Sequence, residues 1–600
     1  MIGGGLRQSR GGKSALAWPA FCFALWLAPA SGVQAQSAAA AADAVVQEGL
    51  RRQEERNRQQ QQHLQPRADV LRPTSRQPSD REFPQEDPCF TVREVLFEGE
   101  DASRFGWLSA GVQPFLGRCA GVRALSRITA SLDEELLSRG FATTRVSLPA
   151  QNLQSGVLRM RLHVGRVAAI RMVEAPEPGA AGSARPLAAP AQPDTRWGTW
   201  RNAFPVSPGD ILNIRDLEQG VEQMKRLPSQ SVGTQLEPGE APDTSVVIIQ
   251  RRAGGLAERV HGSATVDNSG ASALGRAQFS GNLALDNLLG LNDVLSANLA
   301  SNLQDPGASH HSQSLGVNYS VPWGYNTFSL SASHSRFAQY VQGTTVRFLS
   351  SGQSENAEVK LARNVLRTSS AKLGVYGSIS LRRAQSYIDD VELIVQRRRT
   401  TNAEAGLSYR QLFDSSTLDL DLGYRRGVPW SNAQEDLPDA RMGGPTLRPR
   451  IASFSASYAA AFALAGRQLQ YTGTLRGQHT RDATLSIDQL SIGGRHSVRG
   501  FTGDAVLLAE NGLVWRNDLS WPVRLGLGID THAILGLDWG RVWGPSDVLL
   551  AGRRLAGASF GLRGRASALY FDLSLATPLR RPDNFHAKRL VAYASVTYPF

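Results

Sequence analysis

The chain has 600 residues and a formal net charge of +12. This length is too great for one compact domain and predicts several structural units. A basic balance also occurs in nucleic-acid-binding proteins, but Lys and Arg are thinly spread here and no nucleic-acid motif is present, so we expect no nucleic-acid partner.

Residues 1–35 are typical of a secretory signal peptide. Three basic residues, Arg7, Arg10 and Lys13, precede an apolar run from Ala15 to Ala30, and Val33-Gln34-Ala35 fits a small-x-small cleavage site. The run is short for the alternative, a membrane-anchoring helix. Cleavage would remove three positive charges and no acids, which leaves +9 on the mature chain.

No later stretch approaches the roughly 18 to 20 consecutive apolar residues that a membrane helix needs. A helical inner-membrane protein is therefore excluded. An outer-membrane barrel is not excluded, because its strands alternate between apolar and polar residues.

Two cysteines remain after Cys22 leaves with the signal peptide. Cys89 and Cys119 would meet an oxidising compartment, where a disulfide is the default state, although two free buried thiols remain an alternative. Two thiols without nearby histidines cannot complete a tetrahedral metal shell, so we expect no metal site and no cofactor.

Residues 36–66 are rich in Ala, Gln, Glu and Arg, which favour a helix. Such a helix would be polar on nearly every side, so it would stand in water or in a polar cavity, and a partly disordered segment is the other interpretation. Residues 67–87, rich in Pro, Arg, Ser and Asp, predict a flexible linker.

Residues 88–166 and 167–254 predict two small αβ units in tandem. For the first unit we expect a strand at 91–97, a helix at 123–139 and strands at 143–148 and 157–164. For the second we expect a strand at 168–173, a Pro/Ala-rich insertion at 174–194, a helix with Asn213 as its N-cap and a closing strand at 245–251.

Residues 255–600 lack helical periodicity and alternate apolar and polar positions between turn-rich breaks, as in Leu418-Asp419-Leu420-Asp421-Leu422. This pattern predicts a transmembrane β-barrel, with a soluble β-sandwich or propeller as the alternative. The last strand argues for the barrel, because it carries one apolar face to its end at Tyr598 and Phe600. Pairing of the last strand with the first would remove the exposed edge.

Several stretches resemble the TpsB family, the transporters of two-partner secretion that are relatives of the barrel-assembly proteins. They are GFATTRVSLPAQNLQSGVLRMRLHVGRV (140–167), LNIRDLEQGVEQMKRLPSQ (212–230), DNSGASALGR (267–276) and LDNLLGLND (285–293). The matches occur in the family's order and extend over most of the mature chain.

The resemblance implies a mainly β fold. A plug helix at 36–66, two periplasmic POTRA domains at 88–166 and 167–254, and a sixteen-stranded antiparallel barrel at 255–600 are expected. It also implies that Cys89 and Cys119 form a disulfide in the first POTRA domain.

The most specific match is IGGRHSVRGF at 492–501. In the superfamily this motif lies on a long loop that folds back into the barrel, so the resemblance assigns that role here to Gly493, Gly494, Val498, Arg499, Gly500 and Phe501. The family's partner for the arginine is an inward-facing acid on a barrel strand. Asp538 in LGLDWGRV matches it, although the residues before the acid depart from the family pattern.

The function implied is secretion without enzymatic chemistry. The POTRA domains would capture a large unfolded exoprotein, and strand addition to a sheet edge is a way in which they can do so. The exoprotein would then cross the barrel and fold outside. Outer-membrane lipid and the barrel-assembly machinery are further expected partners. A barrel-assembly factor is the main alternative; a surface-displayed enzyme is disfavoured because neither Gly-x-Ser-x-Gly nor His-Glu-x-x-His occurs.

Deletion of residues 36–65 tests the plug. If this segment occupies the lumen, its removal should raise ion conductance in planar bilayers while the barrel still inserts. Unchanged conductance would contradict the assignment.

Overall fold

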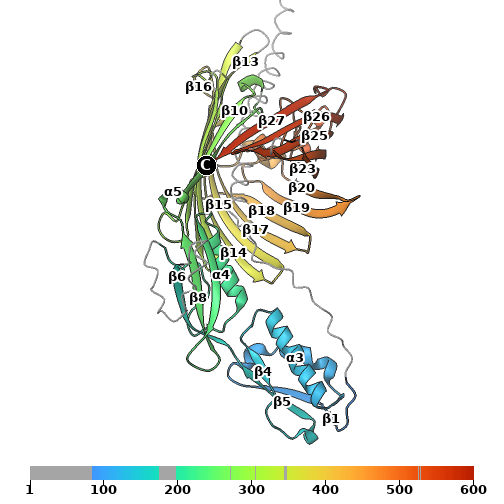
Figure 1. Ribbon diagram of the computed structural model, residues 1–600. Helices are drawn as coiled ribbons and strands as arrows, with labels where there is room; N and C mark the ends of the chain where they lie inside the picture. The colour runs from blue at the N-terminus through green and yellow to red at the C-terminus, as the bar shows by residue number, and fades with distance from the viewer. Residues whose placement is uncertain are drawn as a thin grey trace, which may run out of the picture.

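The computed structural model describes residues 84–174 and 198–600, with short gaps at 271, 305, 343–346, 525 and 527–528. The expected signal peptide, the plug helix at 36–66, most of the linker and most of the Pro/Ala-rich insertion therefore lie outside the described residues. In the described part, two small αβ units precede a large barrel (Figure 1).

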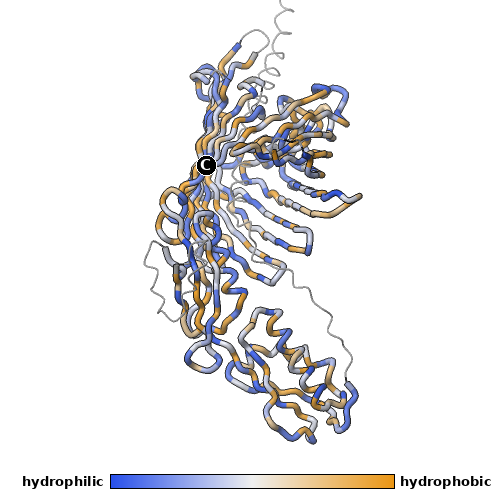
Figure 2. The backbone as a smooth tube through the Cα atoms, in the orientation of Figure 1, coloured by the Kyte–Doolittle hydropathy of each residue, from blue (hydrophilic) through white to orange (hydrophobic). Residues whose placement is uncertain are grey.

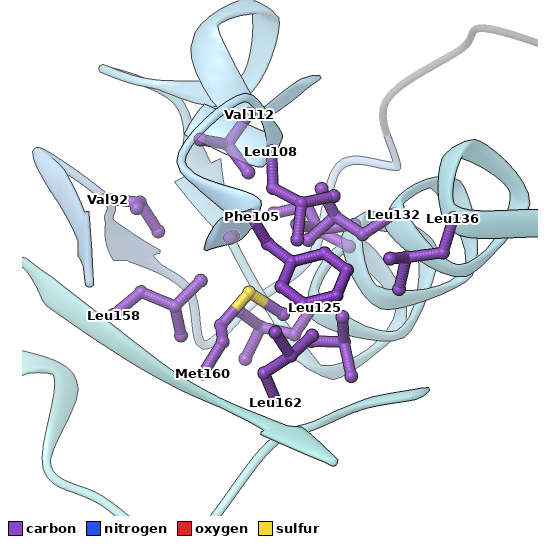
Figure 3. Close-up of a cluster of buried hydrophobic side chains, with 14 of the residues drawn as sticks. Val92, Phe105, Leu108, Val112, Leu125, Leu132, Leu136, Leu158, Met160 and Leu162 are labelled. Carbon is purple, nitrogen blue, oxygen red and sulfur yellow. The ribbon is translucent and has the colours of Figure 1, made fainter. Parts of the chain in front are cut away.

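The first unit packs one long helix, α3, against a three-stranded sheet of order β2-β5-β4, in which β2 and β5 run parallel. The helix stripe that its sequence predicts, Leu125, Ile128, Leu132 and Leu136, is buried against the apolar face of β5 (Figure 3). The elements are β1 (Phe90–Thr91), β2 (Glu94–Glu98), α2 (Leu108–Val112), β3 (Cys119–Ala120), α3 (Val122–Ser138), β4 (Arg145–Ser147) and β5 (Val157–His163).

Cys89 and Cys119 form a disulfide, as expected from the sequence. Cys119 lies in β3, which pairs with β1 next to Cys89. The bond therefore fastens the start of the unit to the residues just before α3.

The second unit repeats this plan with a sheet of order β6-β8-β7, in which β6 and β8 are parallel. Its helix begins after Asn213, whose side chain accepts a hydrogen bond from the backbone N–H of Arg215 at 2.8 Å, so the predicted N-cap is confirmed. The elements are β6 (Arg166–Glu174), α4 (Ile214–Lys225), β7 (Gln230–Pro238) and β8 (Thr244–Ala253).

The other helices of the described part are short, and none of its helices is long and apolar enough to cross a membrane. They are α5 (Leu256–Arg259) and the 3-10 turns η1 (Ala102–Phe105), η2 (Gln113–Phe115), η3 (Leu153–Ser155), η4 (Ser272–Leu274), η5 (Ile394–Gln396), η6 (Pro438–Met442), η7 (Ser486–Asp488) and η8 (Pro545–Leu549).

Sixteen antiparallel strands close into a barrel, which confirms the strand number implied by the resemblance. Polar and apolar residues alternate along them (Figure 2). The strands are β9 (Val260–Asp267), β10 (Gln278–Asp286), β11 (Val294–Asn302), β12 (His311–Trp323), β13 (Asn326–Gln342), β14 (Arg347–Arg367), β15 (Ala371–Ile388), β17 (Arg398–Leu412), β18 (Ser416–Val428), β19 (Arg450–Leu464), β20 (Arg467–Thr480), β23 (Asn511–Arg524), β24 (Asp530–Trp543), β25 (Arg554–Ala566), β26 (Leu569–Arg580) and β27 (Val591–Pro599). The two-residue strand β16 (Val391–Glu392) pairs antiparallel with the last two residues of β15.

The barrel closes where β27 pairs with β9. Tyr598 lies opposite Ala264, and the backbones of Phe600 and Gly262 exchange two hydrogen bonds of 2.8 and 3.0 Å. This seam has five residue pairs, compared with eight between β9 and β10.

The second unit is joined to one end of the barrel through a buried polar face of α4. Glu222 accepts hydrogen bonds from Arg367 at 2.8 Å and Lys372 at 2.6 Å, and the Arg367 side chain is only 1% exposed. The amide of Gln223 donates to the carbonyl of Gly324 in the turn between β12 and β13. These directed polar contacts between α4 and the barrel strands hold the unit against the rim.

Two charged groups at this junction are strongly affected by burial. Burial raises the pKa of the Asp216 carboxyl, which accepts a hydrogen bond from the Tyr325 hydroxyl, and lowers the pKa of the Arg226 guanidinium to about 10. The Arg226 side chain donates to Ser320 of β12 at 2.6 Å.

Replacing both Cys89 and Cys119 with Ser should destabilise the first unit. The disulfide closes a loop with a sequence separation of 30; in the chain-entropy model such a loop contributes about 3 to 4 kcal/mol. We expect the double variant to become sensitive to protease at lower urea concentration within residues 88–166, while the barrel keeps its resistance to SDS. Equal protease sensitivity of the two proteins would contradict this.

Candidate functional site

A loop inside the barrel is the candidate site. The short strands β21 (Leu490–Ile492) and β22 (Leu507–Ala509) pair with each other, and residues 493–506 form the loop between them. This loop contacts the inner faces of β24, β25, β26 and β27. The inner face of β24 is identified by its alternation, since Leu535 and Leu537 are exposed on the other side.

Arg499 and Asp538 form a bidentate ion pair at the centre of this contact. Nε of Arg499 donates to Oδ2 of Asp538, and Nη2 donates to Oδ1, each at 2.6 Å. The backbone N–H of Arg499 donates to the same carboxylate at 3.0 Å. The Asp538 side chain is fully buried and that of Arg499 is 9% exposed, so water competes little for the pair.

A second acid adds to the charge balance. Nη1 of Arg499 lies 2.6 Å from Oδ1 of Asp518 in β23, as a close charge contact without hydrogen-bond geometry. Arg516, two residues before Asp518, lies directly opposite Asp538 in the strand register. Arg499 of the loop and Arg516 of the wall thus lie beside two wall acids, Asp518 and Asp538.

Glycines make room for the loop on both sides of the contact. Gly500 has a φ of +97°, and a Cβ there would lie 2.5 Å from the carbonyl oxygen of Thr577 in β26. A Cβ on Gly557 of β25 would overlap the carbonyl oxygen of Arg499, and one on Gly536 would lie 2.5 Å from Nη2 of Arg499. Gly536 lies two positions before Asp538 on the same strand, and its lack of a side chain leaves space for the guanidinium.

The residues that flank Arg499 anchor the loop through apolar packing. Val498 and Phe501 are buried, and Phe501 meets Phe585 edge-on at 5.7 Å between ring centroids. The Tyr593 hydroxyl of β27 accepts from the N–H of Gly500 and donates to the carbonyl of Phe501 at 2.7 Å.

Gly493 and Gly494 begin the loop at a sharp turn. Gly493 has a φ of +120°, which favours glycine. The Ser497 hydroxyl oxygen accepts from the N–H groups of both glycines, at 3.1 and 3.2 Å. Farther along, Asp504 pairs with Arg276 from the β9–β10 connection at 2.8 Å, so the loop is tied to the barrel at a second place.

The structure thus places all six expected residues on the loop between β21 and β22 and pairs Arg499 with Asp538. Asp518, Gly557 and Tyr593 also contact this loop, and the sequence reasoning did not select them. Their inward strand positions were the available signal, but alternation does not say which inward position faces the loop. Within the described ranges, no group of three or more His, Cys, Asp or Glu residues could hold a metal ion.

Three family matches cover the described units. Residues 243–564 match the family described as haemolysin secretion/activation protein ShlB/FhaC/HecB. Residues 90–165 match the ShlB-type POTRA domain, and residues 176–238 match a further POTRA domain.

The chain is also similar to curated and solved relatives over most of its length. It is 32% identical to outer membrane transporter CdiB-2 of Burkholderia pseudomallei, over 89% of this chain and 90% of the relative. It is 26% identical to hemolysin transporter protein ShlB of Serratia marcescens, over 83% and 84%. The solved structure of CdiB from Escherichia coli superimposes with a TM-score of 0.78 at 28% identity, covering 93% of this chain and 98% of that one.

Replacing Gly557 with Ala should push the loop off the wall, because the new methyl group would overlap the Arg499 carbonyl. A loop-to-wall cross-link provides the measurement. A Cβ at Gly540 would lie 2.9 Å from a Val498 methyl carbon, so cysteines at these two positions should form a disulfide.

We expect the Gly557→Ala change to reduce this cross-link severalfold. Gly377→Ala is the matched control, because a Cβ at Gly377 has its nearest neighbour at 3.9 Å. Undiminished cross-linking in Gly557→Ala would show that the loop does not depend on this close approach.

Proposed function

The chain belongs to the haemolysin secretion/activation protein family, and from this premise we propose how it works as an outer-membrane transporter of two-partner secretion. The barrel spans the outer membrane, and the POTRA domains lie on its periplasmic side. The arginine-bearing loop docked inside the lumen is the observation that carries the mechanism, because a pore for a polypeptide needs an element that occupies part of the path when no cargo is present.

The proposed cargo is a large exoprotein of the TpsA type, taken up before it folds. Haemolysins, adhesins and contact-dependent toxins are the candidate classes, and the gene beside this one would distinguish them. Two POTRA sheets support capture of an extended segment, because each has an edge strand, such as β2 or β7, that can pair with one.

The loop is proposed to control the path through the barrel. Docked through Arg499, residues 493–506 lie against four consecutive strands of the lumen wall. Cargo passage would require at least part of this loop to change position. The Arg499–Asp538 pair would then set how readily the loop leaves, because undocking exposes a buried carboxylate without its partner.

No enzymatic step is proposed. Folding of the exoprotein outside the cell would supply the driving force, since the sequence contains no P-loop for ATP. The alternative, a barrel-assembly factor, is less well supported, because the relatives that match over most of their length are named as transporters.

The proposed division of the chain remains that expected from the sequence. It assigns 1–35 to the signal peptide, 36–66 to the plug helix, 67–87 to the linker, 88–166 and 167–254 to the POTRA domains and 255–600 to the barrel. Tyr598 and Phe600 are proposed to close the barrel at the β9–β27 seam, and their backbone pairing there supports this role.

Arg499→Ala and Asp538→Ala should each abolish most secretion while the barrel remains in the outer membrane. Losing one partner of a buried pair costs roughly 3 to 5 kcal/mol, and this cost falls on the docked loop rather than on the strand pairing. The double variant should be little worse than either single variant, because the two residues act on one contact.

The measurement is the amount of exoprotein in the medium beside the amount of heat-modifiable barrel in the membrane. Arg410→Ala is the control, since it breaks a wall ion pair with Asp419 that does not touch the loop. Normal secretion by Arg499→Ala, or disappearance of the barrel itself, would contradict the proposed role of the loop.

A further inference from the structure

An arginine cluster lies on the outer surface of the barrel, away from the lumen. Along β15, Ile379 and Leu381 are exposed on the outward face, and Arg383 follows on the same face two residues later. Arg382 faces the other way, and its guanidinium lies 3.9 Å from Asp488 near the lumen loop. Arg383 therefore projects outward, directly beyond the apolar surface that contacts lipid.

The height of Arg383 places it at the outer leaflet. Lys372, at the start of β15, contacts the second POTRA domain and marks the periplasmic rim. Eleven residues of strand separate Lys372 from Arg383, which is about 36 Å along the strand. A tilt of roughly 35–45° reduces this to about 26–30 Å of height, compared with an apolar band about 25 Å tall. Arg383 thus lies just beyond the far edge of the hydrocarbon layer, a few residues before the end of β15 that pairs with β16.

Other arginines join Arg383 around a pocket of about 460 Å³. Arg397–Arg399 is the one run of three consecutive basic residues in the sequence, and all three line this pocket. Glu355 is the one acid among the described residues that line it. The pocket therefore carries a net positive charge.

Two of these guanidiniums make few hydrogen bonds or ion pairs with other residues of the protein. Arg383 makes no hydrogen bond or ion pair with any residue that the structure describes, and Arg399 donates to the carbonyl of Ser431 at 3.3 Å. Arg397 differs, because its bidentate pair with Glu392, at 2.7 and 2.5 Å, holds the β16 turn. Arg383, together with Arg399 beside it in the strand register, can therefore offer N–H donors to a bidentate anion.

We propose that this pocket binds a phosphate group of the glycolipid that forms the outer leaflet of the outer membrane. Phosphate is the headgroup chemistry that a planar guanidinium fork matches best. The position supports a lipid source rather than a free ion, because the outward face of β15 is apolar up to Arg383. The acyl chains of a bound lipid would lie along Ile379 and Leu381 while its phosphate meets Arg383 and Arg399.

Binding of purified, detergent-solubilised full-length protein to lipid A tests the proposal. The probes are bisphosphorylated lipid A, dephosphorylated lipid A and inorganic phosphate. We expect Arg383→Gln to weaken binding of bisphosphorylated lipid A about fivefold, and Arg383→Gln/Arg399→Gln to weaken it roughly tenfold to thirtyfold, since each arginine near an anionic headgroup contributes about fivefold in affinity. Dephosphorylated lipid A should bind weakly to the unmodified protein and to both variants.

Arg363→Gln is the matched control. Arg363 lies on the outward face of β14, two residues beyond Leu361 toward the periplasmic rim, so it borders the opposite leaflet. The Arg363→Gln variant should bind lipid A with the same affinity as the unmodified protein. Heat modifiability confirms the fold of each variant, and Arg383→Gln alone decides the question if the double variant does not fold.

Undiminished lipid A binding by folded Arg383→Gln would overturn the proposal. Displacement of lipid A by millimolar inorganic phosphate would also overturn it, because the pocket would then be a site for a free anion.

Discussion

The ion pair between Arg499 and Asp538 is the interaction on which the arrangement of the lumen depends. A bidentate guanidinium–carboxylate contact fixes both the distance and the plane of its partners. To bring the loop backbone this close, the wall must lack side chains at Gly536 and Gly557, and the loop must turn at Gly500. The close approach of the loop therefore determines where the barrel wall carries glycine. Its glycines weaken the strands locally, and the close contact with the loop compensates for the missing side-chain packing.

The periplasmic end of the barrel uses a different solution. There, the second POTRA domain is attached through amides and charged side chains on α4 rather than through a large apolar surface. Glu222 serves two basic residues at once, and both belong to neighbouring strands of the barrel. Such a junction is directional, so it fixes the orientation of the domain, whereas apolar contacts tolerate sliding. The first POTRA domain meets the second through fewer polar contacts, including His163 with Asp243 at 3.3 Å.

The sequence predicted the features of this structure that depend on a repeating pattern or on residues close together in the chain. Alternation along Leu418–Leu422 indicated strands, the stripe from Leu125 to Leu136 indicated a buried helix face, and Asn213 indicated a helix start. Family resemblance supplied the loop and Asp538. The remaining members of the site, Asp518, Gly557 and Tyr593, could not be predicted, because they meet Arg499 only after strands distant in sequence are aligned. The contacts of α4 could not be predicted for the same reason. The run Arg397–Arg399 is visible in the sequence, but its position beside Arg383 depends on the pairing of β15 with β17.

The contacts of the loop also impose an order on how the barrel is completed. Residues 493–506 are synthesised before β23–β27, yet they contact Asp538, Thr577 and Tyr593, which lie on strands made later. The loop cannot reach its final position until those strands have formed and aligned, since such long-range contacts follow the closure of the intervening chain. Docking of the loop is therefore one of the last steps in completing the barrel, and a barrel whose final strands are not aligned lacks the docked loop.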